Sequence, residues 1–116
     1  MLARHEVPGR TYLLTRRCSE RRFFLRSSAE LNAIFEYALA RAVAMTRVKV
    51  HRWVVMSNHM HLVVTDTYGE RPWFMGLLNT ELAKTASALI GRWDGFWEPG
   101  RSYSAVELLD DKAVLE

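Results

Sequence analysis

Apolar residues recur along this chain with two different spacings, which separate its helices from its strands. Over residues 28–45 they return every third or fourth position, which predicts a helix with one buried side. The pattern SSAE at residues 27–30 is a capping box, which predicts where that helix begins. The same spacing predicts a second helix over residues 73–91, with Gly91 as its stop. Its apolar stripe consists of Met75, Leu78, Leu82, Ala86 and Leu89.

Four shorter segments are rich in Val, Leu and aromatic residues, the composition that suits strands. They comprise residues 11–18, 47–56, 60–66 and 103–109. Ser57 and Asn58 form a turn signal between the second and third segments, so these two predict a hairpin. Trp53 alternates within the first hairpin strand, and we expect it in the core.

The predicted order is strand, helix, strand, strand, helix, strand, which is the split β-α-β arrangement of ferredoxin-like folds. We therefore predict an α+β fold, with an antiparallel sheet that carries two main helices on one face. The 116 residues contain no linker-like stretch, so residues 1–116 are expected to form a single domain.

The net charge of +3 conceals an asymmetry between the two halves of the chain. Residues 1–60 hold eleven Lys and Arg against four Asp and Glu, whereas residues 61–116 hold five against nine. The basic half concentrates arginine in one short segment, which favours phosphate contacts. The alternative interpretation is a solvated charged surface. These arginines are Arg16, Arg17, Arg21, Arg22 and Arg26.

Some locations are disfavoured by the sequence. Residues 1–14 lack the continuous apolar region of a signal peptide. No apolar run approaches the roughly 18 residues that a transmembrane helix needs. Cys18 is the only cysteine, so an internal disulfide is excluded, which is consistent with the reducing cytoplasm. We therefore expect a cytoplasmic protein.

The stretch HRWVVMSNHMHLVVTD contains a His–Met–His triplet at residues 59–61. Alternate side chains of a strand point to opposite faces, so His59 and His61 share a face and Met60 points the other way. Positions two apart on a strand are separated by about 6–7 Å, and two neutral imidazoles at that spacing can converge on one divalent ion. The alternative is a surface pair, or a pair of hydrogen-bonded core groups.

The stretch VVMSNHMHLVV resembles the signature of HUH nucleases, in which two histidines flank a hydrophobic residue. It is most similar to the REP-associated tyrosine transposases, whose signature reads much like MPNHVHLL, with Ser57 in place of the usual proline. Residues 96–108, FWEPGRSYSAVEL, also resemble the segment that follows the second helix of that family. The likeness covers nearly the whole chain, and the histidine motif is its most specific part.

The resemblance implies metal-dependent cleavage and joining of single-stranded or hairpin DNA. It assigns His59 and His61 as catalytic residues and as ligands of Mg²⁺ or Mn²⁺, joined by a polar side chain from the second helix. It also implies a nucleophilic tyrosine on that helix. Leu82 aligns with this tyrosine and Ser87 lies near the ligand position, while Asn79 and Glu81 are alternative third ligands.

The predicted second helix contains no tyrosine, so we rank DNA binding above catalysis. The four tyrosines are Tyr12, Tyr37, Tyr68 and Tyr103. A catalytically inactive scaffold for protein–protein contact remains the alternative. Relatives can pair through their sheets, so a homodimer is a further expectation. Residues 108–116 resemble the beginning of a helix, which suggests a chain truncated relative to the family.

Within this resemblance, the clustered arginines are candidates for contacts to the DNA backbone, and exposed tryptophans are candidates to stack on unpaired bases. For Trp97, packing within the protein is the preferred reading. The candidate DNA-binding residues are Arg16, Arg17, Arg21, Arg22 and Trp73.

Overall fold

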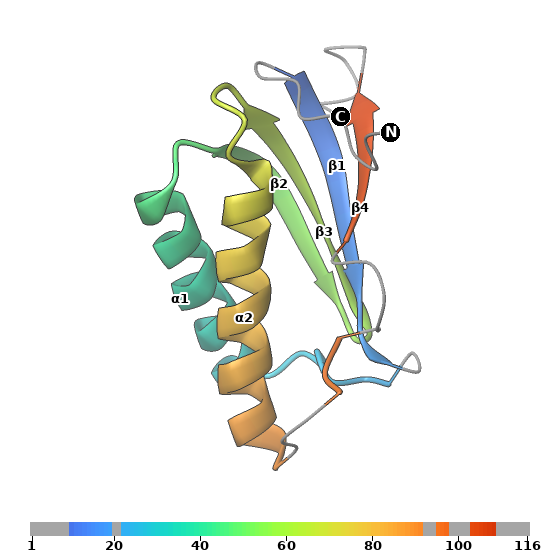
Figure 1. The fold of residues 1–116 in the computed structure, drawn as a ribbon. Helices are drawn as coiled ribbons and strands as arrows, with labels where there is room; N and C mark the ends of the chain where they lie inside the picture. The colour runs from blue at the N-terminus through green and yellow to red at the C-terminus, as the bar shows by residue number, and fades with distance from the viewer. Residues whose placement is uncertain (1–9, 20–21, 92–94, 98–102, 109–116) are drawn as a thin grey trace.

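The chain forms an antiparallel sheet and two helices, in the order that the hydrophobic spacing predicts. The structure is a computed structural model, and it describes residues 10–19, 22–91, 95–97 and 103–108. Figure 1 shows its elements, which are β1 (Arg10–Arg17), α1 (Ala29–Met45), β2 (Lys49–Met56), β3 (His59–Asp66), α2 (Arg71–Ile90) and β4 (Ser104–Leu108).

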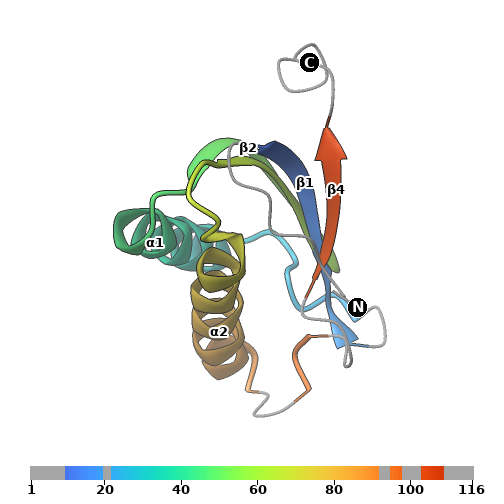
Figure 2. The ribbon, with the colours of Figure 1, turned by 45° about the horizontal axis from the view of Figure 1, so that its top comes forward.

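The four strands lie in the order β2-β3-β1-β4, and every neighbouring pair is antiparallel. β1 and β2 are connected through α1, yet β3 lies between them in the sheet. Both helices lie on the same side of the sheet, as Figure 2 shows. The predicted α+β class, with an antiparallel sheet and two helices on one face, is therefore confirmed.

The two faces of the sheet differ because β3 alternates between them. Met60, Leu62 and Val64 have no exposed surface and pack in the core between the sheet and the helices. The residues between them are partly exposed on the other face, which no described helix covers. We call this second surface the open face. Its central part consists of His59, His61, Val63 and Thr65 of β3 with their β1 partners Arg17, Thr15, Leu13 and Thr11.

The N-terminus of α1 is capped by Ser28. The Ser28 hydroxyl accepts a hydrogen bond from the Leu31 backbone N–H at 3.0 Å. The predicted capping box placed the cap one residue earlier, with Glu30 bonding back to it. That prediction was wrong in its register. The third helical residue after the observed cap is Leu31, whose side chain cannot accept a hydrogen bond from the backbone N–H of Ser28.

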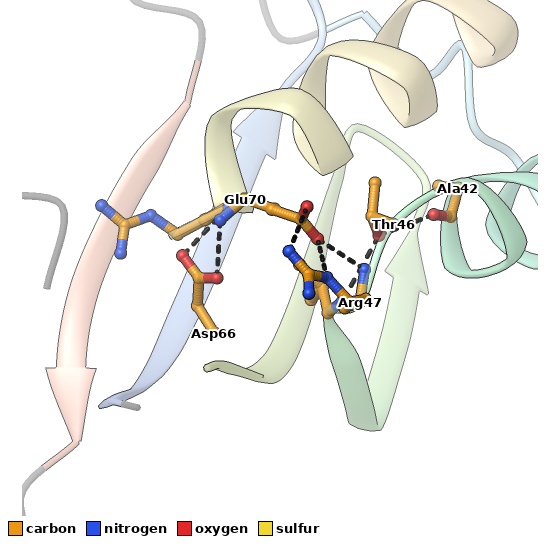
Figure 3. Close-up of polar contacts among 7 residues, drawn as sticks. Ala42, Thr46, Arg47, Asp66 and Glu70 are labelled. Carbon is orange, nitrogen blue, oxygen red and sulfur yellow. Dashed lines mark hydrogen bonds and ion pairs between the residues drawn. The ribbon is translucent and has the colours of Figure 1, made fainter. Parts of the chain in front are cut away.

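The N-terminus of α2 is held by the last residue of β3. The two carboxylate oxygens of Asp66 accept hydrogen bonds from the backbone N–H groups of Glu70, at 2.8 Å, and Arg71, at 3.0 Å. Glu70 in turn accepts from the backbone N–H of Arg47 at 2.7 Å and from its guanidinium at 3.2 Å, as Figure 3 shows. These bonds from Arg47 lower the pKa of Glu70. One polar network thus fixes both helices at this end of the sheet.

The C-terminus of α2 ends where the sequence predicts. Gly91 adopts a left-handed conformation with φ of 74°, which glycine accepts without steric cost, and its N–H donates to the Ser87 carbonyl. The apolar stripe is one turn shorter than predicted, since Leu89 is 47% exposed. None of the helices among the described residues is long and apolar enough to cross a membrane.

Trp53 does not lie in the core, and that prediction was wrong. It is 49% exposed. The reason is the position of its strand: β2 is at the edge of the sheet and has a neighbour on one side only. A strand's alternation predicts which face a residue takes, whereas its burial also depends on how far the helices extend over that strand.

Arg71 is almost fully buried, with 1% of its surface exposed. Its guanidinium carbon lies 3.9 Å from the centre of the Tyr12 ring. Its Nε donates a hydrogen bond to the Tyr103 hydroxyl at 3.3 Å. The charged group therefore joins α2 to β1 and to the residue that precedes β4.

Replacement of Asp66 by alanine should destabilise the fold strongly. One buried and one partly buried N–H group at the start of α2 would lose a charged acceptor, at a cost of about 3 kcal/mol in the free energy of unfolding. Urea unfolding followed by circular dichroism measures this loss.

The matched control is Glu36→Ala, which removes a carboxylate from an exposed position of α1 and should change the free energy by less than about 0.5 kcal/mol. Equal stability of the two variants would show that α2 does not depend on Asp66.

Candidate functional site

Two imidazole rings lie side by side where β3 begins. His59 and His61 both point to the open face, while Met60 between them is buried in the core. Their ring centroids are 4.7 Å apart, and the ring planes are inclined at 82°. Rings this close can present one nitrogen each to the same cation.

The inner nitrogen of each ring is engaged by a neighbouring side chain. His59 Nδ1 donates to the Asn58 Oδ1 atom at 2.7 Å, because a carbonyl oxygen can only accept. His61 Nδ1 lies 2.9 Å from the Thr15 hydroxyl, which can accept or donate. The bond that His59 donates to Asn58 fixes the tautomer in which Nε2 keeps its lone pair. Asn58 and Thr15 are thus orienting residues of the kind that metal-binding histidines commonly have.

Sequence reasoning did not identify either orienting residue. Asn58 directly precedes His59 and could have been found as an acceptor next to the motif. Thr15 lies 46 positions away and becomes a neighbour of His61 only through the pairing of β1 with β3. That pairing register is set by the whole sheet.

The surroundings of both imidazoles favour the neutral form. Burial lowers the pKa of His59, and the positive charge of Arg17 lowers it further. For His61 burial again comes first, followed by the charges of His59 and Arg17. Arg17 faces His59 across the β1–β3 pair, which explains its influence. Near pH 7 both rings therefore have a lone pair available for a metal ion.

The donor set fits a divalent cation in part. His59 and His61 supply two nitrogen ligands on an accessible face. The described residues contain no group of three His, Cys, Asp or Glu side chains that could enclose a metal. Mg²⁺ and Mn²⁺ commonly keep water or phosphate oxygens in their coordination shell. The site therefore suits a cation that shares its ligands with solvent and a bound phosphate.

The second helix cannot complete this site, so the role expected for it was wrong. α2 packs on one side of the sheet, as Figure 2 shows, whereas His59 and His61 point to the other face. Leu82, which aligns with the family's tyrosine, is fully buried in that core, and Ser87 is 5% exposed. Asn79 is buried there too, and the Glu81 carboxylate contacts the Thr85 hydroxyl of its own helix. The sheet separates all of these side chains from the histidines.

None of the four tyrosines lies beside the two imidazoles. Tyr12 and Tyr103 are buried in the core around Arg71, with 5% and 3% exposure. Tyr37 is exposed on α1, in the helical layer. Tyr68 follows β3 at the end of the sheet opposite to the histidines, where the Arg47 guanidinium covers its ring at 3.7 Å. The described residues therefore offer no phenol to a phosphate bound at His59 and His61.

The candidate DNA-binding residues divide into two places. Arg17 lies on the open face beside His59, and Arg16 turns to the helical side, 5.3 Å from the Trp97 ring. Arg22 is exposed near this end of the sheet, with its guanidinium 5.6 Å from the Phe24 ring. Arg21 lies outside the described residues.

Trp73 is 47% exposed but belongs to the first turn of α2, on the other layer and at the opposite end of β3. The structure places Arg17 beside the histidines and leaves Trp73 distant from them.

No protein-family model matches the sequence, and no curated protein is significantly similar to it. Transposases are among the solved structures that share its fold. A REP-associated tyrosine transposase bound to a REP hairpin matches with a TM-score of 0.74 at 16% identity, over 97% of this chain. A candidate transposase from Deinococcus radiodurans R1 matches with a TM-score of 0.68 at 18% identity, over 99% of this chain and 91% of its own.

This chain spans 64% of the length of the REP-associated transposase. The two matches show that the chain has a transposase-like fold. At these identities the likeness concerns the fold alone, so the chemistry of the site is argued from its own residues.

Nuclear magnetic resonance titration of the imidazoles should give pKa values for His59 and His61 below the usual 6.5. Replacement of Arg17 by glutamine removes one of the charges that lower both values, so both should rise without fully returning to 6.5. Burial, the largest cause, remains in the variant. Unchanged values in the Arg17→Gln variant would show that this guanidinium does not act on the rings.

Proposed function

We propose that this protein binds single-stranded or hairpin DNA on the open face, around a divalent cation held by His59 and His61. The observation that supports this most directly is the pair of neutral imidazoles 4.7 Å apart, with Arg17 beside them. A cation and a guanidinium on one surface would attract a phosphodiester. The transposase-like fold and the bound hairpin of one structural neighbour are consistent with this partner.

Each residue of the site has a distinct part in this proposal. His59 and His61 would hold Mg²⁺ or Mn²⁺, which would supply Lewis-acid polarisation of a phosphate oxygen when bound. Asn58 and Thr15 orient the two rings through Nδ1. Burial and the charge of Arg17 both lower the pKa of the two rings, and Arg17 would present its own positive charge to the phosphate.

For the described residues we propose that the protein binds DNA rather than cleaves a DNA strand. Cleavage of the family type needs a nucleophile that can attack the polarised phosphorus. The four tyrosines lie in the core, on the helical layer or at the other end of the sheet. We therefore assign the nucleophile to none of them, and a covalent DNA adduct formed by any of the four would overturn this assignment.

A second candidate function is protein–protein contact through the open face, including a homodimer. Three of its apolar side chains are about half exposed, which a contact surface would explain. These are Val54 at 54%, Met56 at 48% and Val106 at 54%. Self-association by analytical ultracentrifugation, combined with no DNA affinity at low salt, would favour this function over the first.

Metal binding should depend on both histidines of the pair. His59→Ala and His61→Ala should each weaken Mn²⁺ binding by at least about tenfold, because each removes one of two nitrogen ligands. Asn58→Ala should also weaken it, through loss of ring orientation. Electron paramagnetic resonance of free Mn²⁺ measures the affinity.

The matched control is His51→Ala on β2, which removes an exposed imidazole that bonds to Thr65. Its Mn²⁺ affinity should equal that of the parent. Binding should also fall as the pH drops through the lowered pKa values of the pair, because protonation occupies Nε2. Equal affinity in all four variants would place the metal elsewhere.

DNA affinity should fall steeply with salt, because phosphate contacts release counterions. Arg17→Ala should weaken binding of a fluorescent DNA hairpin and reduce the slope of log affinity against log salt by about one. Arg41→Ala removes the same charge from the exposed side of α1 and serves as the control. Absence of any hairpin binding by the parent at low salt would exclude the proposed function.

A further inference from the structure

A cavity of about 630 Å³ lies on the helical side of the sheet, away from the open face. It is bounded by the outer surface of α2, by the end of β1 and by residues 95–97. Its volume falls within the range of about 300–1,000 Å³ that is usual for small-molecule sites. Its lining includes Arg16, Gly76, Lys84 and Trp97.

One wall of this cavity is a tryptophan held in a fixed orientation. The Trp97 indole Nε1 donates to the Asn79 carbonyl at 2.8 Å. The Phe96 ring meets the indole edge-on at a centroid distance of 4.8 Å. An aromatic wall fixed in this way can pack against a flat ring without further loss of conformational freedom.

A glycine in the middle of α2 also lines the cavity. A Cβ atom placed on Gly76 would meet no atom within 4 Å, so the missing side chain leaves open space beside the helix. Gly76 is not needed for a turn, because its position is helical and it has no positive φ. Glycine costs roughly 1 kcal/mol in a helix relative to alanine. Its presence here is consistent with a surface on which a ligand comes close to the helix.

The charge of the cavity suits an anion. Arg16 lies at one side, with its guanidinium 5.3 Å from the Trp97 ring, and Lys84 lies at another. Among the described residues that line the cavity, none is acidic. Two cations and a fixed indole form the combination that binds a nucleotide by its phosphate and by its base.

The cavity adjoins the histidine site around an edge of the sheet. Arg16 pairs with Met60 and Arg17 with His59, so the two arginines point to opposite faces at the same level. β4 pairs with β1 only as far as Thr15, and the next described contact on that side is the bridge from Cys18 to Trp97. Arg16 and Arg17 thus lie between these two pairings. This is the sheet edge that a DNA strand would cross to pass from the open face to the helical side.

We propose that this cavity binds one unpaired nucleotide of the same DNA strand that crosses the open face. Arg16 and Lys84 contact its phosphate, and its base packs against Trp97 and the bare backbone at Gly76. The proposal rests on the function proposed above and adds to it a site for a single-stranded segment on the helical side. A DNA with an unpaired tail should therefore bind more tightly than the same hairpin without one.

The test compares a labelled DNA hairpin that has an unpaired tail with the same hairpin cut blunt, by fluorescence anisotropy in the presence of a chelator. Without metal, the contribution of the tail is measured apart from the histidines. Gly76→Leu fills the cavity and Lys84→Glu reverses a charge. Each should reduce the affinity gained from the tail by about tenfold, while the affinity for the blunt hairpin changes much less.

One matched control keeps the result specific. Lys49→Glu makes the same charge change on β2, away from the cavity, and should retain the gain from the tail. Gly76→Ala places a single methyl group where the base would pack, so its gain should lie between those of the parent and of Gly76→Leu. Circular dichroism melting should show that Gly76→Leu is no less stable than the parent, because leucine favours a helix over glycine.

The outcomes distinguish the two proposals. If the parent binds both hairpins and the variants keep the full gain from the tail, the cavity is not a nucleotide site and the proposed function stands. If the parent gains nothing from the tail, the cavity proposal fails in the same way. If the parent binds neither hairpin, the proposed function fails and this inference fails with it.

Discussion

The alternation of side chains along β3 is the constraint on which the rest of the structure depends. Met60, Leu62 and Val64 fill the centre of the core, and the residues between them face outward. A shift of one residue would bury both imidazoles and expose the apolar set. β3 is paired on both sides, to β1 and to β2, so its register is fixed by two neighbours. The same contacts that make the core therefore set the position of His59 and His61.

The end of the sheet far from the histidines carries much of the polar stabilisation. Asp66 holds the start of α2, Glu70 joins it to Arg47, and Thr46 donates to the Ala42 carbonyl at the end of α1 (Figure 3). This network connects the last turn of α1, the start of β2, the end of β3 and the first turn of α2. The helices are fixed at that end. The end of the sheet that carries the histidines, called here the near end, can therefore present its charged and polar groups to a ligand.

The near end combines two surfaces that differ in chemistry. The open face carries the imidazole pair, whereas the helical side carries a cavity with a fixed indole and two cations. Arg16 and Arg17 are consecutive, and strand geometry sends one to each surface. A pair of adjacent basic residues in a strand thus links two sites that the sheet itself separates.

Local sequence determined much of the fold. Spacing of apolar residues located all six elements, Gly91 marked the end of α2, and the triplet at residues 59–61 placed its two imidazoles on one face. These features depend on residues within one or two turns of each other, or on the period of a single strand. They can be read without knowing which elements become neighbours.

Tertiary structure decided the rest, because it depends on contacts between distant segments. Only the sheet order made β2 an edge and left Trp53 exposed. Only the β1–β3 register brought Thr15 to His61. Only the packing of α2 on the far side of the sheet removed its polar residues from the histidines. The sequence by itself determined which side chains share a face, and the tertiary structure decided what lies opposite each face, since that follows from pairing and layering across the whole chain.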